Sequence, residues 1–151
     1  MIGTNYPPIL QRWFSDLWTD GNMAALDGLV TVDFVAHAPH DFTIRLTRHD
    51  YQRMLQWYHH TFADPQWQID DVIVAGNSMV VRCTGWATYR GGWLDIPSTE
   101  QRTRECCIMI FRLAGGRIQE LWFEVSDLDV IHQLGARVTV DDQAHPKQPL
   151  P

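Results

Sequence analysis

The change of hydrophobic period near residue 65 constrains the fold of this chain most strongly. In the first half, apolar residues recur every three or four positions, and this period predicts helices over residues 7–18, 23–29 and 47–62, with one strand at 31–38. In the second half, apolar and polar residues alternate, which predicts strands over residues 67–75, 78–90, 103–113 and 117–125. Helices followed by hairpin-connected strands indicate an α+β fold.

Chain length and the C-terminal composition set the domain organisation. A chain of 151 residues has the size of one domain. A short helix is expected at residues 126–135, and the polar, proline-containing segment after it has the composition of a tail. We expect one domain over residues 1–137, in which a curved antiparallel sheet wraps around the N-terminal helices to form a cone with an internal pocket, and a C-terminal polar tail at 138–151.

Charge and cysteine usage exclude several classes of function. Twelve Lys and Arg against eighteen Asp and Glu give a net charge of −6, which is the wrong sign for a nucleic-acid partner. The cysteines Cys83, Cys106 and Cys107 lack CxxC spacing, which favours a reducing cytoplasm over a zinc site or a disulfide scaffold. No stretch approaches eighteen apolar residues, so we expect a cytoplasmic protein without a membrane partner.

Aromatic side chains are unusually frequent, with seven Trp, four Tyr and six Phe. Rings in such number either fill a core or line a pocket for a flat apolar ligand. Some lie on the predicted helices that would close the cone, and others lie on its predicted wall and mouth. We expect a hydrophobic small-molecule substrate or ligand to contact seven side chains: Trp13, Tyr58, Trp86, Tyr89, Glu105, Met109 and Trp122.

Polar residues recur at alternate positions of the predicted strands. Arg82 shares a strand face with Trp86, and Glu124 shares one with Trp122. In one interpretation these faces look at water, and Arg82 pairs with a glutamate across the sheet. In the other they line the mouth of the cone, where burial would raise the pKa of a carboxyl group and a nearby arginine would lower it. Alternation alone leaves both interpretations open.

Two histidines follow the predicted strand at 31–38. His37 and His40 have the HxxH spacing of a metal site, but their loop supplies no carboxylate partner, so no metal is expected. No Walker or Rossmann glycine pattern is present. We therefore expect no cofactor.

Four segments carry the motifs of one protein family in the family's order. They are RWFSDLWTDGNMAALDGLVTVDFVAH, FADPQWQIDDVIVAGNSMVVRCT, TYRGGWLDIPST and IMIFRLAGGRIQELWFEVSDLDVIHQLGA. Over residues 9–136 the chain resembles the SnoaL-like polyketide cyclases, small members of the nuclear-transport-factor-like cone fold. The resemblance implies a cofactor-independent enzyme that uses general acid/base catalysis, in aldol-type cyclisation or isomerisation, on a hydrophobic carbonyl or polyketide-like substrate.

The resemblance also points to site residues. The family's acid/base aspartate lies four residues after the strand tryptophan, where this chain has Ser126, and Tyr89 stands where the family usually has histidine. A serine hydroxyl needs a base of its own to move a proton at neutral pH. The base is expected instead from a neighbouring carboxylate, the oxyanion donor from a strand arginine, and a further hydrogen bond from a histidine or from Tyr89. The catalytic residues expected on this basis are Glu124 or Asp127, Arg82 and His37.

Two alternatives to a cyclase stay open. Limonene-type epoxide hydrolases, a second branch of the cone fold, use an arginine and carboxylates to polarise the epoxide and activate water, and Arg82 and Glu124 are similarly placed. The fold also serves as a non-catalytic ligand-binding or dimerising module. By resemblance, a homodimer is expected through an outer sheet face that carries Leu121, Phe123 and Val125, unless these residues form core.

Overall fold

The computed structural model describes residues 6–139, so most of the expected C-terminal tail lies outside the described residues. The helices are α1 (Pro8–Arg12), η1 (Trp13–Thr19), η2 (Met23–Ala25), α2 (Leu26–Leu29), α3 (Arg48–Thr61) and α4 (Asp127–Gln133). The strands are β1 (Val30–His37), β2 (Arg45–Thr47), β3 (Phe62–Ala75), β4 (Ser78–Tyr89), β5 (Arg102–Ala114) and β6 (Arg117–Val125). The predicted α+β class is confirmed.

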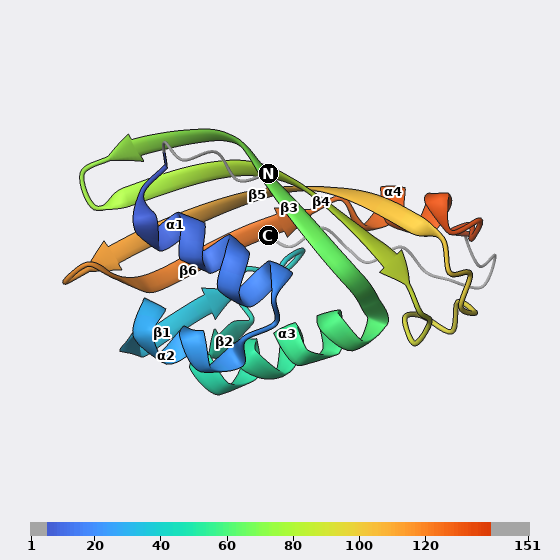
Figure 1. Ribbon diagram of the computed structural model, residues 1–151, viewed down its shortest axis with the longest axis horizontal. Helices are drawn as coiled ribbons and strands as arrows, with labels where there is room; N and C mark the ends of the chain where they lie inside the picture. Colours follow the sequence, from blue (N-terminus) through green and yellow to red (C-terminus); the bar gives the residue numbers. More distant parts are fainter. Residues whose placement is uncertain (1–5, 140–151) are drawn as a thin grey trace, which may run out of the picture.

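Six strands form one curved sheet that does not close, in the order β2-β1-β6-β5-β4-β3. The strands from β3 to β6 follow one another as an antiparallel meander. Strand β1 enters the sheet beside the last strand and runs parallel to β6, so the expected fully antiparallel sheet is wrong in this one pair. Figure 1 shows α1 and α3 against the same side of the curved sheet, where they cover its concave face.

The first helix departs from the regular α-helix that its apolar period predicts. At Trp13 it widens into a π-helical turn that runs to Thr19. Within this turn the Asp20 N–H donates to the Ser15 carbonyl over a distance of 2.8 Å, five residues back. The wider turn presents four large side chains to the sheet, and all are buried: Trp13, Phe14, Leu17 and Trp18.

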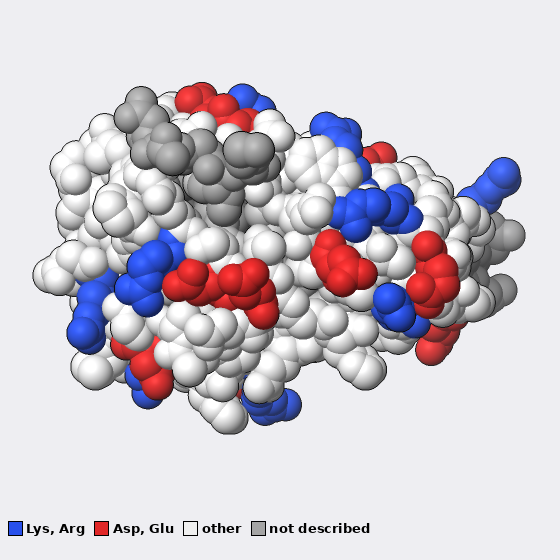
Figure 2. Space-filling model, in the orientation of Figure 1, with Lys and Arg blue, Asp and Glu red and all other residues white. Residues whose placement is uncertain are grey.

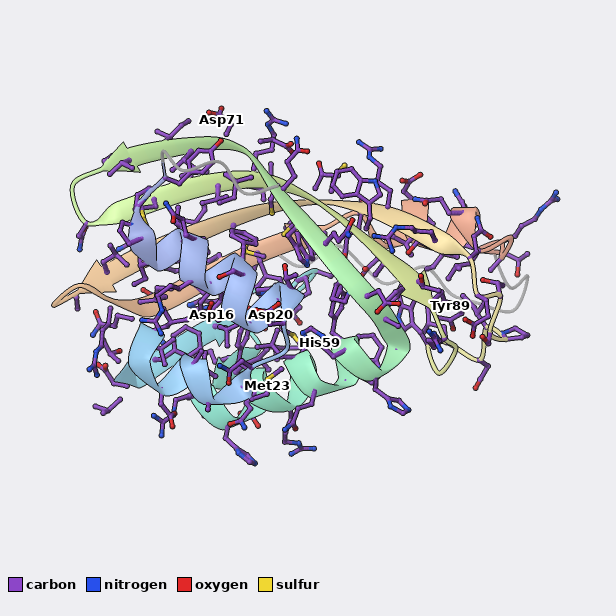
Figure 3. The ribbon with its side chains drawn as sticks, in the orientation of Figure 1. Asp16, Asp20, Met23, His59, Asp71 and Tyr89 are labelled. Carbon is purple, nitrogen blue, oxygen red and sulfur yellow. The ribbon has the colours of Figure 1, made fainter. Side chains whose placement is uncertain are left out.

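Helix α3 has a defined start and leads directly into the sheet. Thr47 and Asp50 form a capping box at its N-terminus. Its end at Thr61 passes straight into β3, and the Asp64–Pro65 pair, which the sequence suggests as a break, lies within that strand at a shift of register. A proline is tolerated there because β3 is an edge strand. His59 ties α3 to η1 by donating from Nε2 to the Leu17 carbonyl, over 2.8 Å (Figure 3).

An aromatic core fills one part of the concave side. Trp13 is fully buried, and its ring centroid lies 5.5 Å from that of Tyr51 and 5.5 Å from that of Phe111. The expectation that Trp13 contacts substrate is therefore wrong, since its ring packs against other core rings and does not line the cavity described below.

The surface gives no sign of a concentrated basic area on the face in view. Figure 2 shows Lys and Arg side chains interspersed with Asp and Glu there. Among residues 6–139, no helix is both long and apolar enough to span a membrane.

Candidate active site

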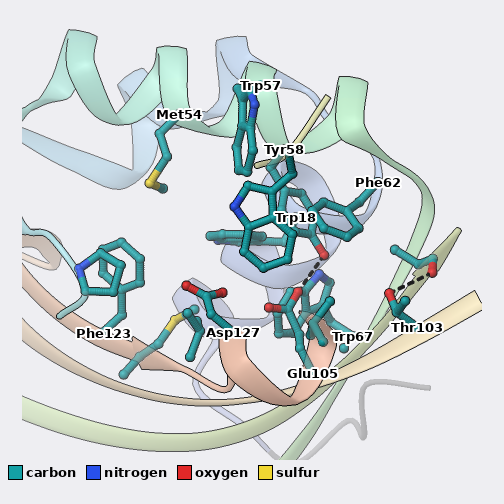
Figure 4. Close-up of a pocket in the computed structure, with 17 residues that line it drawn as sticks. Trp18, Met54, Trp57, Tyr58, Phe62, Trp67, Thr103, Glu105, Phe123 and Asp127 are labelled. Atoms are coloured by element: carbon teal, nitrogen blue, oxygen red, sulfur yellow. Dashed lines mark hydrogen bonds between the residues drawn. The ribbon is translucent and has the colours of Figure 1, made fainter. Parts of the chain in front are cut away.

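A cavity of about 120 Å³ lies between helix α3, η1 and the inner face of the sheet. Figure 4 shows Met54, Trp57 and Tyr58 reaching into it from α3, opposite the carboxylates of Glu105 and Asp127. Seven aromatic side chains line its walls: Trp18, Trp57, Tyr58, Phe62, Trp67, Trp93 and Phe123. The cavity is therefore an aromatic chamber with two acidic groups.

Space for the cavity comes from a glycine in the middle of the sheet. Gly85 on β4 is the register partner of Trp67 on β3 and of Glu105 on β5, so the three residues form one row across the inner face. A Cβ atom at Gly85 would lie 2.9 Å from atoms of the Trp67 ring, which is closer than side chains tolerate. The missing side chain lets the indole of Trp67 lie over the strand.

Glu105 is the carboxylate whose environment is most altered. It is partly buried on β5, and its Oε1 accepts a hydrogen bond of 2.8 Å from the Tyr58 hydroxyl. Burial in this apolar chamber raises the pKa of Glu105 to about 7, with a further rise from the negative charge of Asp127, while the Tyr58 hydrogen bond opposes the shift. Glu105 therefore exchanges a proton near neutral pH.

Asp127 lines the cavity, and its carboxylate is hydrogen-bonded to a residue that does not line the cavity. It begins α4, and its Oδ2 accepts a hydrogen bond of 2.7 Å from His40 Nε2. The backbone N–H of His40 donates to Glu124 over 2.8 Å. The hydrogen bond to Asp127 is the main reason that the pKa of His40 is raised above 6.5. Through His40, the loop that places Pro39 at the cavity wall is therefore hydrogen-bonded to Glu124 and to Asp127.

Two tryptophans that line the chamber have buried indole N–H groups without a hydrogen bond of standard geometry among the described residues. These are the indole Nε1 groups of Trp18 and Trp67, and both side chains are at least nine-tenths buried. A buried N–H without an acceptor costs free energy.

The family of the chain follows from comparison with known proteins. The model for the SnoaL-like polyketide cyclase family matches residues 9–134. The chain belongs to this family. No curated protein matches the sequence significantly.

Solved structures share the fold of this SnoaL-like protein at low sequence identity. IdmH from Streptomyces antibioticus has a TM-score of 0.75 and 20% identity, over 86% of this chain and 100% of that one. A SnoaL-like polyketide cyclase from Agrobacterium tumefaciens has a TM-score of 0.67 and 16% identity, over 84% and 95%. A hypothetical protein with a ketosteroid isomerase-like fold from Catenulispora acidiphila, in complex with trimethylamine, has a TM-score of 0.72 and 18% identity, over 88% and 96%.

The structure brings together four of the site residues expected for this SnoaL-like protein. Tyr58, Glu105, Met109 and Asp127 all line the cavity. Of these, only Asp127 was expected as an acid or base, whereas Glu105 was expected as a substrate contact. The sequence pattern carried a signal for Glu105, because it is the one carboxylate on the strand face that also bears Cys107 and Met109.

Three expected residues lie on the outer face instead. Arg82 is 58% exposed and pairs with Asp70 over 3.4 Å, and Trp86 shares its outward orientation. Glu124 is 47% exposed and binds His40. The placement expected for these three is wrong because the more apolar face of each strand turns inward: on β4 that face carries Val81, Cys83 and Ala87, which are all buried.

His37 and Trp122 also lie outside the cavity, against each other. Their rings stack with centroids 4.6 Å apart, and Arg112 lies over the same indole at 5.2 Å. His37 Nε2 donates to Glu120 over 2.8 Å. The histidine that was expected to donate to substrate is therefore engaged in an outer cluster. His37 and His40 have different partners, and no group of three potential metal ligands occurs within residues 6–139.

Tyr89 and Ser126 have local hydrogen-bonding partners. The hydroxyl of Tyr89 donates to the Ile96 carbonyl over 2.7 Å and accepts from the Trp93 N–H over 3.2 Å. Tyr89 thereby holds the loop that places Trp93 at the cavity, and it does not line the cavity itself. Ser126 Oγ accepts from the Cys106 N–H over 2.9 Å. Most lining residues were not expected at the site, among them six aromatic ones: Trp18, Trp57, Phe62, Trp67, Trp93 and Phe123.

Proposed function

We propose that this SnoaL-like protein is a cofactor-independent acid/base enzyme that isomerises or cyclises a small carbonyl compound, with Glu105 as the base. The observation that carries the proposal is the partly buried carboxylate of Glu105 in an aromatic chamber, with its pKa raised to about 7. A base is most effective when its pKa lies near the working pH, because it is then both ionised and able to hold a proton.

The proposed step moves one proton and needs no co-reactant. Ionised Glu105 takes a proton from the carbon next to the substrate carbonyl, and the electron pair of that C–H bond moves to the oxygen to form an enolate. The resulting carboxylic acid returns the proton at another carbon in isomerisation. In an aldol-type cyclisation, the enolate carbon attacks a second carbonyl, and the proton passes to the new alkoxide.

In the proposed step, a hydrogen-bond donor beside Glu105 stabilises the negative charge on the enolate oxygen. Tyr58 donates to Glu105 in the free protein (2.8 Å). Once Glu105 is protonated, its carboxylic acid accepts that bond less strongly, and the hydroxyl can donate to the developing oxyanion. Donors that are already in place stabilise charge as it develops in the transition state.

Proton exchange tests the proposal without knowledge of the natural substrate. A panel of small ketones and β-dicarbonyl compounds is incubated with the protein in D₂O, and exchange of the α-protons is followed by NMR. The wild type is expected to accelerate exchange of at least one compound, and Glu105→Gln should reduce the rate by about 10²–10⁴-fold. The rate should rise with pH through about 7 as Glu105 ionises.

A matched control uses the outer face of the sheet. Glu120→Gln makes the same chemical change on the neighbouring strand, outside the chamber, and should keep the exchange rate within about twofold. If folded Glu105→Gln exchanges protons as fast as the wild type, Glu105 is not the base.

The epoxide hydrolase alternative loses its structural basis. It requires Arg82 and Glu124 to act together on one substrate, and these side chains lie outside the cavity with partners of their own. A non-catalytic binding role would leave exchange at the uncatalysed rate for every compound of the panel, so the same experiment separates it from the enzyme.

We also propose a homodimer formed through the outer face of β5 and β6. Of the residues first expected there, Leu121 and Phe123 are buried core, and Val125 lines the cavity. The outer face carries Ile108, which is 52% exposed, and Ile110, whose register partner is Trp122. Arginine and glutamate side chains flank them, so a two-fold axis could pair opposite charges. Ile108→Asp should shift a dimer to monomer in sedimentation equilibrium, and a wild-type monomer would contradict the proposal.

A further inference from the structure

The charge balance of the cavity is one-sided. Among the described residues that line it, Glu105 and Asp127 are acidic, and none is Lys, Arg or His. The nearest imidazole, that of His40, binds Asp127 from the surface loop and does not line the chamber. An anionic ligand would meet the carboxylate of Glu105, whose hydrogen-bonding partner is the neutral hydroxyl of Tyr58. A ligand with positive charge would supply the missing counter-charge.

The walls have the chemistry that binds cations without hydrogen bonds. The rings of Trp18, Tyr58 and Trp67 are in mutual contact, with centroids of Trp18 lying 5.0 Å from Tyr58 and 5.2 Å from Trp67. Phe62 continues this cluster, since its ring centroid lies 5.2 Å from that of Tyr58 and 5.9 Å from that of Trp93. Aromatic faces attract an organic cation within about 6 Å of the ring centroid, most strongly where water is excluded. The chamber combines such rings with carboxylates.

The volume limits what can enter. A cavity of roughly 150 Å³ holds one benzene molecule in a protein interior. The present cavity of about 120 Å³ therefore accepts a compact group and excludes a fused ring system. Tetramethylammonium has fewer heavy atoms than benzene. A longer ligand would extend through the mouth past Trp57, which is 42% exposed.

We propose that the cavity binds a small organic cation, namely the alkylammonium group of an amine-bearing ligand. The inference rests on the proposed function for its site, since it names the substrate class of the same chamber. A positive charge held there would also stabilise an enolate formed beside it, so the two proposals are chemically compatible. The binding itself requires no chemical step.

Two isosteric probes isolate the contribution of charge. Choline and its neutral carbon analogue 3,3-dimethylbutan-1-ol have the same shape, because a carbon atom replaces the nitrogen. Each is titrated into the full chain at pH 8 by calorimetry, with tryptophan fluorescence as a second readout. Choline is expected to bind at least about tenfold more tightly than the neutral analogue. Equal affinities, or no binding of either probe, would overturn the proposal.

Variants assign the preference to the cavity. Glu105→Gln should weaken choline binding about tenfold and leave the neutral analogue within twofold. Glu100→Gln removes the same charge from an exposed residue that pairs with Arg90 over 3.3 Å, and it should change neither affinity. Trp57→Leu keeps an apolar side chain at the mouth but removes its ring, and it should weaken choline selectively. A choline preference that survives in Glu105→Gln would overturn the role given to that carboxylate.

The two proposals fail in different ways. A choline preference combined with undiminished proton exchange in Glu105→Gln would contradict the proposed function and support the cation site. Loss of exchange in that variant without a choline preference in the wild type would support the function and overturn the cation site. Thermal melts of every variant confirm that the protein measured is folded.

Discussion

Two glutamates on adjacent strands show how differently the two faces of this sheet treat the same side chain. Glu105 on β5 points into the aromatic chamber, where Tyr58 donates to it and burial raises its pKa to about 7. Glu120 on β6 points outward and accepts a hydrogen bond of 2.8 Å from His37 Nε2. The side chain is the same in both places. The strand face on which it stands decides whether it can exchange a proton near neutral pH or forms a surface pair.

The largest contrast between the faces should appear in stability. Trp13→Ala removes a fully buried ring from the core and should lower the free energy of unfolding by about 3–5 kcal/mol. Trp122→Ala removes an outer ring that packs on His37 and Arg112, and it should cost about 1 kcal/mol. Chemical denaturation measures both. Equal losses would show that the outer face is covered as completely as the inner one.

The next contrast is in the pH dependence of stability. Between pH 4.5, the ordinary value for Glu, and about 7, the folded protein keeps a proton on Glu105 that the unfolded chain has lost. Stability due to this group therefore falls as the pH rises through that window and stays low above it. Glu105→Gln removes the penalty, so from pH 4 to pH 8 it should gain up to about 3 kcal/mol relative to the wild type.

The control for this prediction is again the outer glutamate. Glu120→Gln loses the hydrogen bond from His37 and should gain no stability over the same pH range. Denaturation at several pH values measures the difference between each variant and the wild type. Parallel stability curves for Glu105→Gln and the wild type would show that Glu105 is as well solvated in the folded protein as in the unfolded chain.

The smallest predicted effect concerns two glycines. Gly85→Ala places a Cβ atom 2.9 Å from the Trp67 ring, so the indole must move into the cavity, at a cost of about 1–2 kcal/mol. Gly28→Ala in α2 meets its nearest side-chain atom at 3.9 Å, and it should be neutral or stabilise by about 0.4–1 kcal/mol. Denaturation measures the stability of both variants. A Gly85→Ala variant with unchanged stability and ligand binding would contradict the described role of this glycine.

The fold was largely predictable because its signals are local. Hydrophobic period and turn residues located α3 and the strands from β4 to β6 within a few residues, and the family motifs supplied the cone. The π-helical turn at Trp13 and the parallel pairing of β1 with β6 were not predictable in this way. Both depend on contacts between segments that are far apart in the sequence, and a local sequence pattern contains no information about such contacts.

The site was predictable only in part because alternation divides a strand into two faces without saying which is inside. On β4 the polar face with Arg82 and Trp86 was expected to look into the mouth, but the face with Val81 and Cys83 is the buried one. Burial of the more apolar face decides the orientation of this strand and of β6. On β5, Glu105 is then the exception, because it is the charged residue on an inner face that otherwise carries Thr103, Cys107, Met109 and Phe111.

The loop after β4 has a consequence for the thermodynamics of recognition. The hydroxyl of Tyr89 is hydrogen-bonded to the backbone of Ile96 and of Trp93. The loop that places Trp93 at the cavity is therefore fixed to β4 already in the free protein. Figure 3 shows Tyr89 at the end of β4, where this loop begins. A ligand meets a preorganised rim, and little conformational entropy is lost at each encounter, because the loop was ordered once, during folding.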